Sequence, residues 1–355
     1  MVRDITRRGP RAARFALAVA AAVVLPFACT HPVHADPVIA SGRLLADATS
    51  ANGSYVERVT VDDTRSLVLF VHSGSMNRTV PVQVQRPADT SRPRPVLYLL
   101  NGGGGGQDGD TWAARTDVLT FLADKNVNVV TPIGGAWSYY TDWQRPDPVL
   151  GVNKWKTFLT QELPPLVDAG LGTSGRNAIA GLSTSATAAL ALPIAAPGLY
   201  RSAASFSGCA QTSDPIGMRA VRLSVETWGG GNTDNMYGPP DDPMWAANDP
   251  YLHADQLRGV ALYISTGTGL PGSHDQLDGP YALPGVSGLE NQLVVGGVIE
   301  AATNYCTHIL ADRLSRLGIP ARVNFRDTGT HSWGYWRDDL KDSWPTLAAP
   351  LAIPG

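Results

Sequence analysis

The sequence of 355 residues predicts an α/β fold in which a mostly parallel sheet is covered by helices on both faces. Short apolar runs bounded by turn residues are typical of buried parallel strands. Longer stretches of helical composition separate these runs, so strand and helix alternate along the chain. The apolar runs are residues 95–100, 127–131, 178–181 and 261–265, and the helical stretches are residues 112–124, 154–169, 184–195 and 290–317.

Composition narrows the class of protein. The 28 Lys and Arg residues against 31 Asp and Glu residues give a net charge of -3, which excludes a nucleic-acid binder that relies on a basic surface. Hydrophobic residues make up 43% of the chain, which is too many for a disordered acidic protein. The 37 Gly and 27 Pro residues are scattered between the apolar runs, which indicates a globular protein with long loops.

The N-terminal segment has the pattern of a signal peptide. A basic start rich in arginine precedes an apolar stretch at residues 15–27, and Val33-His34-Ala35 has the small-x-small form of a cleavage site. The apolar stretch is shorter than the roughly 20 residues that span a bilayer. We therefore predict that residues 1–35 are removed on export, that no segment spans the membrane, and that the protein is secreted or held in the cell envelope.

The remaining chain divides into three predicted parts. Residues 36–68 are mostly polar, and we expect an N-terminal arm or an edge hairpin there. Residues 69–348 contain the alternating strands and helices and form one catalytic domain. Within this domain, residues 211–251 are rich in Gly, Asp, Pro and Trp and are too long for an ordinary loop, which predicts a cap-like insertion with short helices.

Ser183 is the candidate nucleophile. Gly181-Leu182-Ser183 follows an apolar strand and precedes a helix of small residues, which predicts the sharp turn called a nucleophile elbow. Ser185 stands where the motif usually has a second glycine, and its small side chain still allows strand and helix to approach. The alternative is that Ser183 only caps the helix. A lone serine is a weak nucleophile at neutral pH, so catalysis requires a base and an acid downstream.

His331 and Glu300 are the candidate base and acid. His331 lies in a loop just after the last apolar run, where the hydrolase order of serine, acid and histidine places the base. Glu300 is a single carboxylate in an apolar context, and a buried carboxylate without a partner is costly, which favours a role for it. The alternatives for the acid are Glu290, Asp275 and Asp278, whose neighbours indicate solvated loops.

The glycine run at residues 102–106 is the candidate source of an oxyanion site. It directly follows a strand, at the position where hydrolases of this type offer a backbone amide to pair with the amide after the nucleophile. A phosphate-binding loop is disfavoured because no Gly-Lys-Ser/Thr follows, and a plain flexible loop is the other alternative. The sequence has no metal-ligand spacing such as His-Glu-x-x-His, so we predict no metal and no other cofactor.

Several longer motifs lie between about Arg65 and Trp344. They are Leu99-Leu100-Asn101-Gly102, Thr131-Pro132-Ile133-Gly134-Gly135, Tyr140-Thr141-Asp142-Trp143, Thr157-Phe158-Leu159-Thr160-Gln161-Glu162-Leu163-Pro164, Met236-Tyr237-Gly238-Pro239, Asn248-Asp249-Pro250 and Gly329-Thr330-His331-Ser332-Trp333-Gly334-Tyr335-Trp336. In this order they resemble the secreted mycolyltransferases of mycobacteria and corynebacteria, the antigen 85 group of α/β-hydrolases. The resemblance implies a triad of Ser183, Glu300 and His331, with the backbone amides of Gly103 and Thr184 at the oxyanion site.

The chain departs from this family at the sugar-binding motif. The trehalose-processing members usually read Leu-Leu-Asp-Gly-Leu-Arg where this chain has Leu99-Leu100-Asn101-Gly102-Gly103-Gly104, so a carboxylate and a guanidinium are missing. The family's paired cysteines after the Asp-Trp motif are also absent. The residues predicted to contact substrate are Asn101, Gly102, Trp228, Trp245 and Trp333.

The predicted function is transfer of a mycolyl or other long acyl group from an ester donor, such as trehalose monomycolate, to a hydroxyl acceptor. Trehalose, arabinogalactan and a protein hydroxyl are the acceptors considered, and no nucleic acid is expected as a partner. Two alternatives remain open. One is a secreted carboxylesterase, and the other is a non-catalytic envelope-binding protein, against which the intact Ser183 and His331 argue.

Cys209 and Cys306 are the only cysteines left after removal of the signal peptide. In an oxidising compartment such a pair is more often a disulfide than two free thiols. We therefore predict a disulfide that links two walls of the active site and helps to hold Glu300. The alternative is a buried free Cys209 beside the triad.

Overall fold

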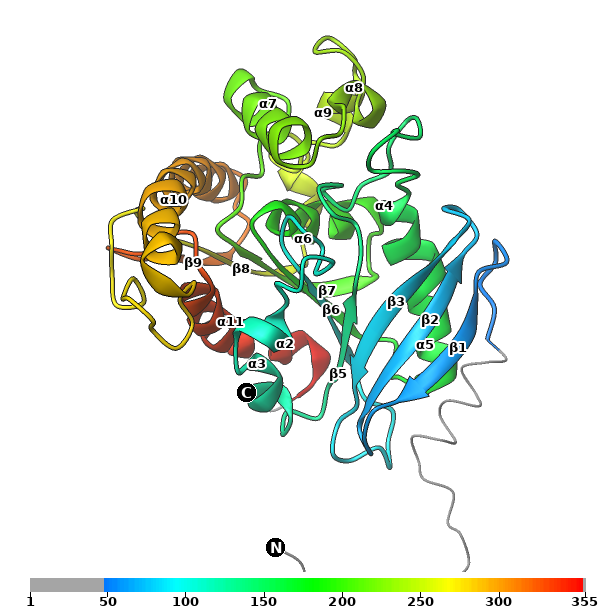
Figure 1. Ribbon diagram of the computed structural model, residues 1–355. Helices are drawn as coiled ribbons and strands as arrows, with labels where there is room; N and C mark the ends of the chain where they lie inside the picture. Colours follow the sequence, from blue (N-terminus) through cyan, green and yellow to red (C-terminus); the bar gives the residue numbers. More distant parts are fainter. Residues whose placement is uncertain (1–47, 354–355) are drawn as a thin grey trace, which may run out of the picture. The chain divides into compact units, whose positions relative to one another are not determined.

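Nine strands form one sheet in residues 48–353, the part of the chain that the computed structural model describes (Figure 1). Their order is β1-β2-β3-β5-β4-β6-β7-β8-β9, with antiparallel pairs from β1 to β5 and parallel pairs from β5 to β9. The strands are β1 (Tyr55–Val61), β2 (Ser66–Ser73), β3 (Arg78–Gln85), β4 (Val96–Leu100), β5 (Asn128–Pro132), β6 (Asn177–Leu182), β7 (Tyr200–Phe206), β8 (Ala261–Thr266) and β9 (Ala321–Phe325). The predicted mostly parallel α/β-hydrolase sheet is confirmed. The predicted signal peptide lies outside the described residues.

The central strands are buried because helices cover both faces of the sheet. Every residue of β4, β5 and β6 is buried, which explains why apolar residues dominate these strands. One face packs against α5, α6 and α10, and the other packs against α2, α3 and α11. The helices of these layers are α2 (Trp112–Arg115), α3 (Val118–Leu122), α4 (Trp155–Thr157), η1 (Phe158–Glu162), α5 (Leu163–Leu171), α6 (Thr184–Ala195), η3 (Ala254–Leu257), α10 (Gly285–Arg316), α11 (Trp333–Ala348) and η4 (Ala349–Leu351).

The N-terminal end of the described chain is an antiparallel hairpin of β1 and β2 at the edge of the sheet. Buried and half-exposed positions alternate along β2, as expected for an antiparallel strand with one covered face. This strand crosses the predicted boundary at residue 68, so the hairpin and the catalytic domain share one sheet.

Three predicted helices differ from the structure at their boundaries. The helix expected at 154–169 spans Trp155 to Leu171 as the consecutive segments α4, η1 and α5. The helix expected at 112–124 is broken into α2 and α3 because Thr116 is extended and bonds back to the Trp112 carbonyl through its hydroxyl, at 2.5 Å. Asp117, the next residue, is held by Arg337 and Lys341 of α11. The helix expected at 290–317 begins five residues earlier, at Gly285.

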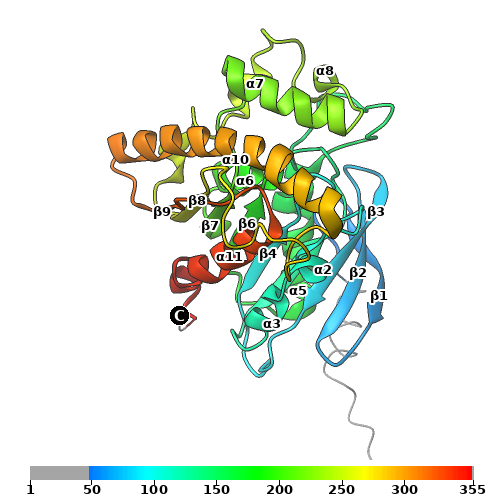
Figure 2. The same ribbon diagram turned by 60° about the vertical axis from the view of Figure 1, so that its left-hand side comes forward.

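The segment predicted as an insertion forms four short helices beyond the sheet, seen at the top of Figures 1 and 2. They pack on a separate apolar cluster, in which Trp143 and Tyr139 of an earlier loop meet Val225 and Trp245. The helices are α7 (Pro215–Arg222), η2 (Leu223–Trp228), α8 (Thr233–Met236) and α9 (Met244–Ala247).

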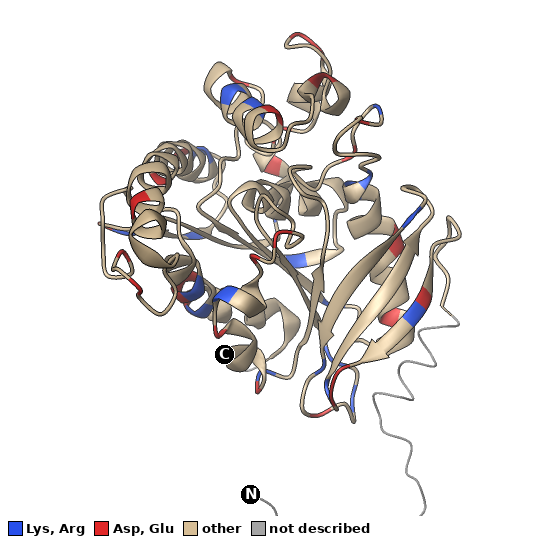
Figure 3. Cartoon of the chain, viewed as in Figure 1, with Lys and Arg blue, Asp and Glu red and all other residues tan. Residues whose placement is uncertain are grey.

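Charged residues of both signs are interspersed over the elements in the view of Figure 3. The middle of α10 carries almost none, and within the described residues this helix alone is long and apolar enough to cross a membrane by length and composition. Its Glu300, Leu310 and Leu314 are buried, and it packs against the sheet. These contacts identify α10 as a helix of the α/β domain.

Candidate active site

Ser183 lies at a strained turn between β6 and α6. Its φ of 57° and ψ of -123° are rare for a residue with a side chain and typical of a nucleophile elbow. A Cβ at Gly181 would lie 2.4 Å from the Ser185 carbonyl oxygen, so only glycine fits beneath the turn. The Ser183 hydroxyl makes no capping hydrogen bond to α6, which argues against the capping alternative.

Ser185 supports this turn from inside. Its side chain is fully buried, and its hydroxyl accepts from the Leu182 amide and donates to the Leu182 carbonyl, each at 2.9 Å. The residue that replaces the second glycine therefore fixes the elbow by hydrogen bonding.

His331 and Glu300 are directly hydrogen-bonded. Nδ1 of His331 lies 2.9 Å from Oε2 of Glu300, and the side chains are 8% and 0% exposed. The backbone amide of His331 donates to the Gly296 carbonyl of α10 at 3.1 Å, and the ring meets Trp336 edge-on. The other ring nitrogen, Nε2, is buried without a hydrogen-bond partner among the described residues, and His331 lines the same cavity as Ser183. Catalytic hydrogen bonds often tighten only when substrate binds.

Glu300 is buried in a shell of donors. Its Oε1 accepts from the Gly267 amide at 2.6 Å and from the Ser207 hydroxyl at 2.8 Å. Arg326 adds a charged contact to the same oxygen at 3.1 Å. A carboxylate accepts hydrogen bonds, so this shell of donors holds Glu300 in the position from which it orients the imidazole.

The other candidate acids do not contact His331. Asp275 accepts from Thr330 at 2.5 Å and from Tyr335 at 2.6 Å, and so ties its loop to the segment around the histidine. Burial, together with Asp275, raises the pKa of Tyr335. Asp278 accepts from the Gly285 amide, and Glu290 is exposed on α10.

The glycine loop and the first residue of α6 lie beside the nucleophile. A Cβ built on Gly102 would lie 3.8 Å from the Ser183 Cβ, so the glycine loop runs next to Ser183. Within residues 48–353, neither the Gly103 amide nor the Thr184 amide donates a hydrogen bond to the protein. Both residues line the cavity, which leaves two donors available for an oxyanion.

A cavity of about 530 Å³ opens at Ser183 and runs between α10 and the α7–η2 segment, which neighbour each other in Figure 2. Apolar side chains dominate its outer walls. Those from α7 and η2 are Ile216, Leu223 and Trp228, and those from α10 are Val295, Val298, Ile299 and Ala302. Such a site suits a ligand with a long apolar part.

Three of the five residues predicted to contact substrate line the cavity, and two do not. Gly102, Trp228 and Trp333 line the cavity. Asn101 is fully buried outside it, and its Oδ1 accepts from the Trp112 amide at 3.2 Å. Trp245 also lies outside the cavity, because its ring packs on Tyr237 and its Nε1 donates to the Gly238 carbonyl. The predictions for Asn101 and Trp245 are therefore corrected to structural roles.

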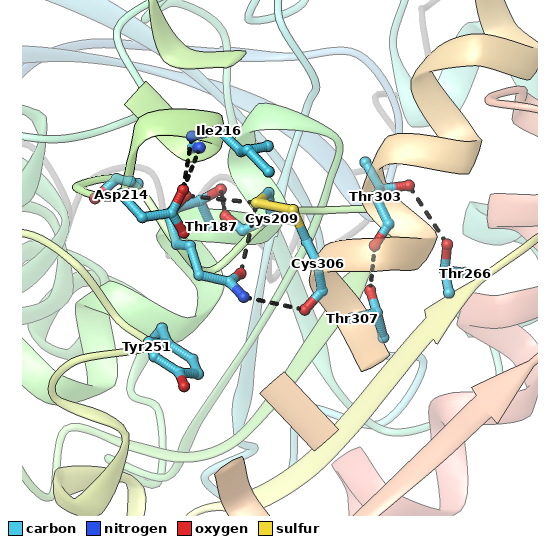
Figure 4. The surroundings of a disulfide bond; sticks show 12 residues. Thr187, Cys209, Asp214, Ile216, Tyr251, Thr266, Thr303, Cys306 and Thr307 are labelled. Atoms are coloured by element: carbon cyan, nitrogen blue, oxygen red, sulfur yellow. Dashed lines mark hydrogen bonds between the residues drawn. A yellow bond between two sulfur atoms is a disulfide. The ribbon is translucent and has the colours of Figure 1, made fainter. Parts of the chain in front are cut away.

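Cys209 and Cys306 form the predicted disulfide (Figure 4). The bond joins the loop after β7 to α10, and both cysteines line the cavity. The Gln211 side chain reinforces the link with a hydrogen bond to the Cys306 carbonyl at 3.5 Å. The disulfide thus ties the helix that carries Glu300 to the end of the central sheet.

Breaking this disulfide is expected to lower both the melting temperature and the turnover rate. The closed loop spans 97 residues, and the chain-entropy treatment gives up to about 4–5 kcal/mol for such a loop. Thermal unfolding and ester hydrolysis before and after reduction measure the two effects, with the Cys209→Ser/Cys306→Ser double variant as the control that is insensitive to reductant. Two titratable thiols in the unfolded, non-reduced mature protein would contradict the disulfide.

Sequence reasoning missed two charged residues of the site. Arg326 follows β9 and contacts Glu300, and Asp339 of α11 contacts Arg326 in turn. No motif singles them out, and their meeting depends on how β9, α10 and α11 pack. Among residues 48–353 no group of three or more His, Cys, Asp or Glu side chains is arranged to hold a metal ion.

The fold and this geometry define the class of protein as a serine-dependent enzyme of the α/β-hydrolase type. Residues 73–347 match the family described as Esterase, putative esterase. The chain is 31% identical over 89% of its length to a diacylglycerol acyltransferase/mycolyltransferase Ag85B of Mycobacterium avium, and it covers 90% of that protein. It is 32% identical to an Ag85A enzyme of Mycobacterium leprae, with 81% and 84% of the two chains covered. The protein belongs to this esterase family and, within it, to the Ag85 mycolyltransferase relatives.

A solved structure supports the fold assignment independently. The crystal structure of Mycobacterium tuberculosis MPT51 superimposes with a TM-score of 0.63 and covers 80% of this chain and 97% of its own. At 24% identity this likeness shows the fold alone.

Proposed function

We propose that this protein transfers a long acyl group, of the mycolyl type, from an ester donor to a hydroxyl acceptor. The observation that carries the proposal is the position of Ser183 and the His331–Glu300 pair at one end of an apolar-walled cavity. The names of the relatives agree with acyl transfer. Acyl transfer through a serine, histidine and carboxylate needs neither a metal nor another cofactor.

Acylation begins with the Ser183 hydroxyl. His331 Nε2 takes its proton as Ser183 Oγ attacks the donor carbonyl, and Glu300 stabilises the imidazolium from the other side. The amides of Gly103 and Thr184 donate to the oxyanion of the tetrahedral intermediate. His331 then returns the proton to the leaving alcohol, which leaves an acyl ester on Ser183.

Deacylation repeats these steps in reverse with a new alcohol. The acceptor hydroxyl gives its proton to His331 and attacks the acyl carbonyl, and the proton passes to Ser183 as the product ester leaves. Transfer requires that the acceptor outcompete water. An acyl chain lying between α7–η2 and α10 would shield the ester from solvent.

The polar end of the cavity offers a place for the acceptor. Asp108 and Asp110 line the cavity, in the same stretch of chain as the glycine loop. Carboxylate oxygens accept hydrogen bonds from hydroxyl groups, so this part of the wall suits a sugar such as trehalose. Trehalose monomycolate is the donor proposed here, and export to the cell envelope through the N-terminal signal would bring the enzyme to that lipid.

The test is product analysis with a defined donor. Purified mature protein is incubated with trehalose monomycolate, with and without an added acceptor, and the products are identified by mass spectrometry. A new diester or a new acyl-acceptor ester supports transfer. Free acid alone in the presence of acceptor identifies a carboxylesterase, and no Ser183-dependent product of either kind identifies a non-catalytic binding protein.

The apolar wall is expected to select long acyl chains. Val298 lines the cavity and is 71% exposed, so Val298→Glu places a charge on the wall without opening the core. In the complex, Val298 would contact a long acyl chain, and the variant loses that apolar contact. We expect a fall of about 10-fold or more in kcat/KM for a hexadecanoyl ester and a much smaller change for an acetyl ester, which is too short to reach this wall.

The matched control for this variant is Val286→Glu. Val286 is also on α10 and 62% exposed, but it does not line the cavity. The two variants add the same charge to the same helix and should differ only for long-chain substrates. Equal effects of both variants on hexadecanoyl ester turnover would show that this wall does not bind the acyl chain.

A further inference from the structure

Behind the triad, Arg326 lies between two buried carboxylates. Its Nη2 is 3.1 Å from Glu300 Oε1, and its Nη1 is hydrogen-bonded to Asp339 Oδ2. The side chains of Glu300 and Asp339 are 0% and 2% exposed, and that of Arg326 is 15% exposed. The three residues come from α10, α11 and the segment after β9, so the arrangement is a product of tertiary packing.

We propose that Arg326 and Asp339 act as a pair of positioning residues that sets the proton affinity of His331 through Glu300. This rests on the proposed function only in taking His331 as the general base. Arg326 neutralises part of the charge of Glu300 and so weakens its hold on an imidazolium. Asp339 in turn offsets the charge of Arg326, and charges buried this close act strongly on one another.

Among the described residues, the other groups in contact with Glu300 are uncharged apart from His331. Glu300 is otherwise faced by the Gly267 amide and by hydroxyls of Ser207, Thr266 and Thr303. The Arg326 guanidinium lies over the Tyr335 ring, at 5.3 Å from its centroid. Two further carboxylates are bonded to neighbouring tyrosines: Asp275 accepts from Tyr335, and Asp342 accepts from Tyr263 and is also paired with Arg322.

Asp339 can change its charge within an accessible pH range. Burial raises the pKa of Asp339 to about 6, although the attraction of Arg326 opposes this shift. Burial lowers the pKa of Arg326, but the charges of Asp339 and Glu300 outweigh that effect, so the pKa of Arg326 is raised. Asp339 is therefore ionised at neutral pH, where the pair has no net charge. Below about pH 6 it takes up a proton, and the pair then places one positive charge behind Glu300.

Two charge-removing substitutions should shift His331 in opposite directions. Asp339→Asn removes a negative charge and keeps an acceptor for Arg326, so the pKa of His331 should fall. Arg326→Met removes the positive charge that contacts Glu300 and keeps an unbranched side chain, so the pKa of His331 should rise. Asp339 then loses the attraction that opposes its protonation and takes up a proton more readily, so this rise is smaller than a single charge removal alone would give. Each shift is expected to be about half to one pH unit, and Arg326→Lys should restore most of the wild-type value.

The experiment is an NMR titration of the His331 imidazole in the full mature chain. The signal is assigned by its loss in His331→Gln, and the titration is made in a Ser183→Ala background so that it does not depend on turnover. In parallel, the acid limb of kcat/KM for a soluble acetyl ester is measured in the variants with Ser183 intact. Opposite shifts of the His331 pKa, followed by the acid limb, support the proposal.

Shifts in the same direction, or no shift, would overturn the proposal and leave the pair with a purely structural role. If Arg326→Met does not fold, as judged by circular dichroism, Asp339→Asn against wild type still gives a signed result. Failure of the proposed function is seen separately, as turnover that does not depend on Ser183 while the imidazole titration still responds to Asp339.

Discussion

Ser183→Ala is expected to reduce ester turnover by about 10³-fold or more while leaving the fold intact. The hydroxyl is the only group lost, and it makes no hydrogen bond that holds the turn. Steady-state kinetics with an acetyl ester and with trehalose monomycolate measure the loss. Labelling by a fluorophosphonate should disappear in parallel, because the covalent site is removed.

Ser185→Ala is the informative control for this variant. The Ser185 hydroxyl bonds the backbone amide and carbonyl of Leu182. Ser185→Ala should therefore lower the melting temperature more than Ser183→Ala does, and should reduce ester turnover less. Wild-type turnover in Ser183→Ala would contradict the elbow interpretation and direct attention to Ser185 or Ser207.

Glu300→Gln is expected to lower kcat by about 10² to 10⁴-fold. The amide keeps the shape of the carboxylate but cannot stabilise an imidazolium. Its NH2 group is also a donor, whereas the Gly267 amide and the Ser207 hydroxyl that surround this position already donate. Ester hydrolysis at pH 8 measures the effect, with thermal unfolding to separate it from a loss of stability.

Glu290→Gln on the same helix provides the comparison, because Glu290 is exposed two to three turns away from Glu300 and contacts neither His331 nor Ser183. It should retain nearly full activity. The reverse ranking of the two variants would move the triad acid to Glu290.

The strands and the elbow could be predicted because their information is local. Buried parallel strands such as β4 and β6 are composed almost entirely of apolar residues and glycine, and the turn at Ser183 requires a glycine two residues before it. The break between α2 and α3 could not be predicted in this way. Thr116 ends α2 locally, through its bond to the Trp112 carbonyl, but a threonine inside a helical pattern is not by itself a stop signal. The next residue, Asp117, is held by α11, more than 200 residues away in sequence, and the helical pattern of residues 112–124 carries no trace of that contact.

The same limit explains the errors among the contact residues. Trp245 and Trp228 both lie in the insertion and look equivalent in sequence, but only Trp228 reaches the cavity. The Trp245 ring packs against Tyr237 and donates to the Gly238 carbonyl, and these contacts hold it away from the cavity. Arg326 and Asp339 carry no sequence signal at all, because three separate elements bring them to Glu300.

The helix α10 gives this enzyme a way to change its substrate without changing its chemistry. Val295, Val298 and Ala302 lie on the face that lines the cavity. Glu300 lies on the opposite, buried face, where it bonds His331, and Gly296 lies between the two faces, where its carbonyl accepts from the His331 amide. Because helical periodicity separates the two faces, mutations can accumulate on the first while selection preserves the second. Substitutions on the first face can therefore alter the fit of the acyl chain step by step, while each intermediate keeps an intact catalytic triad.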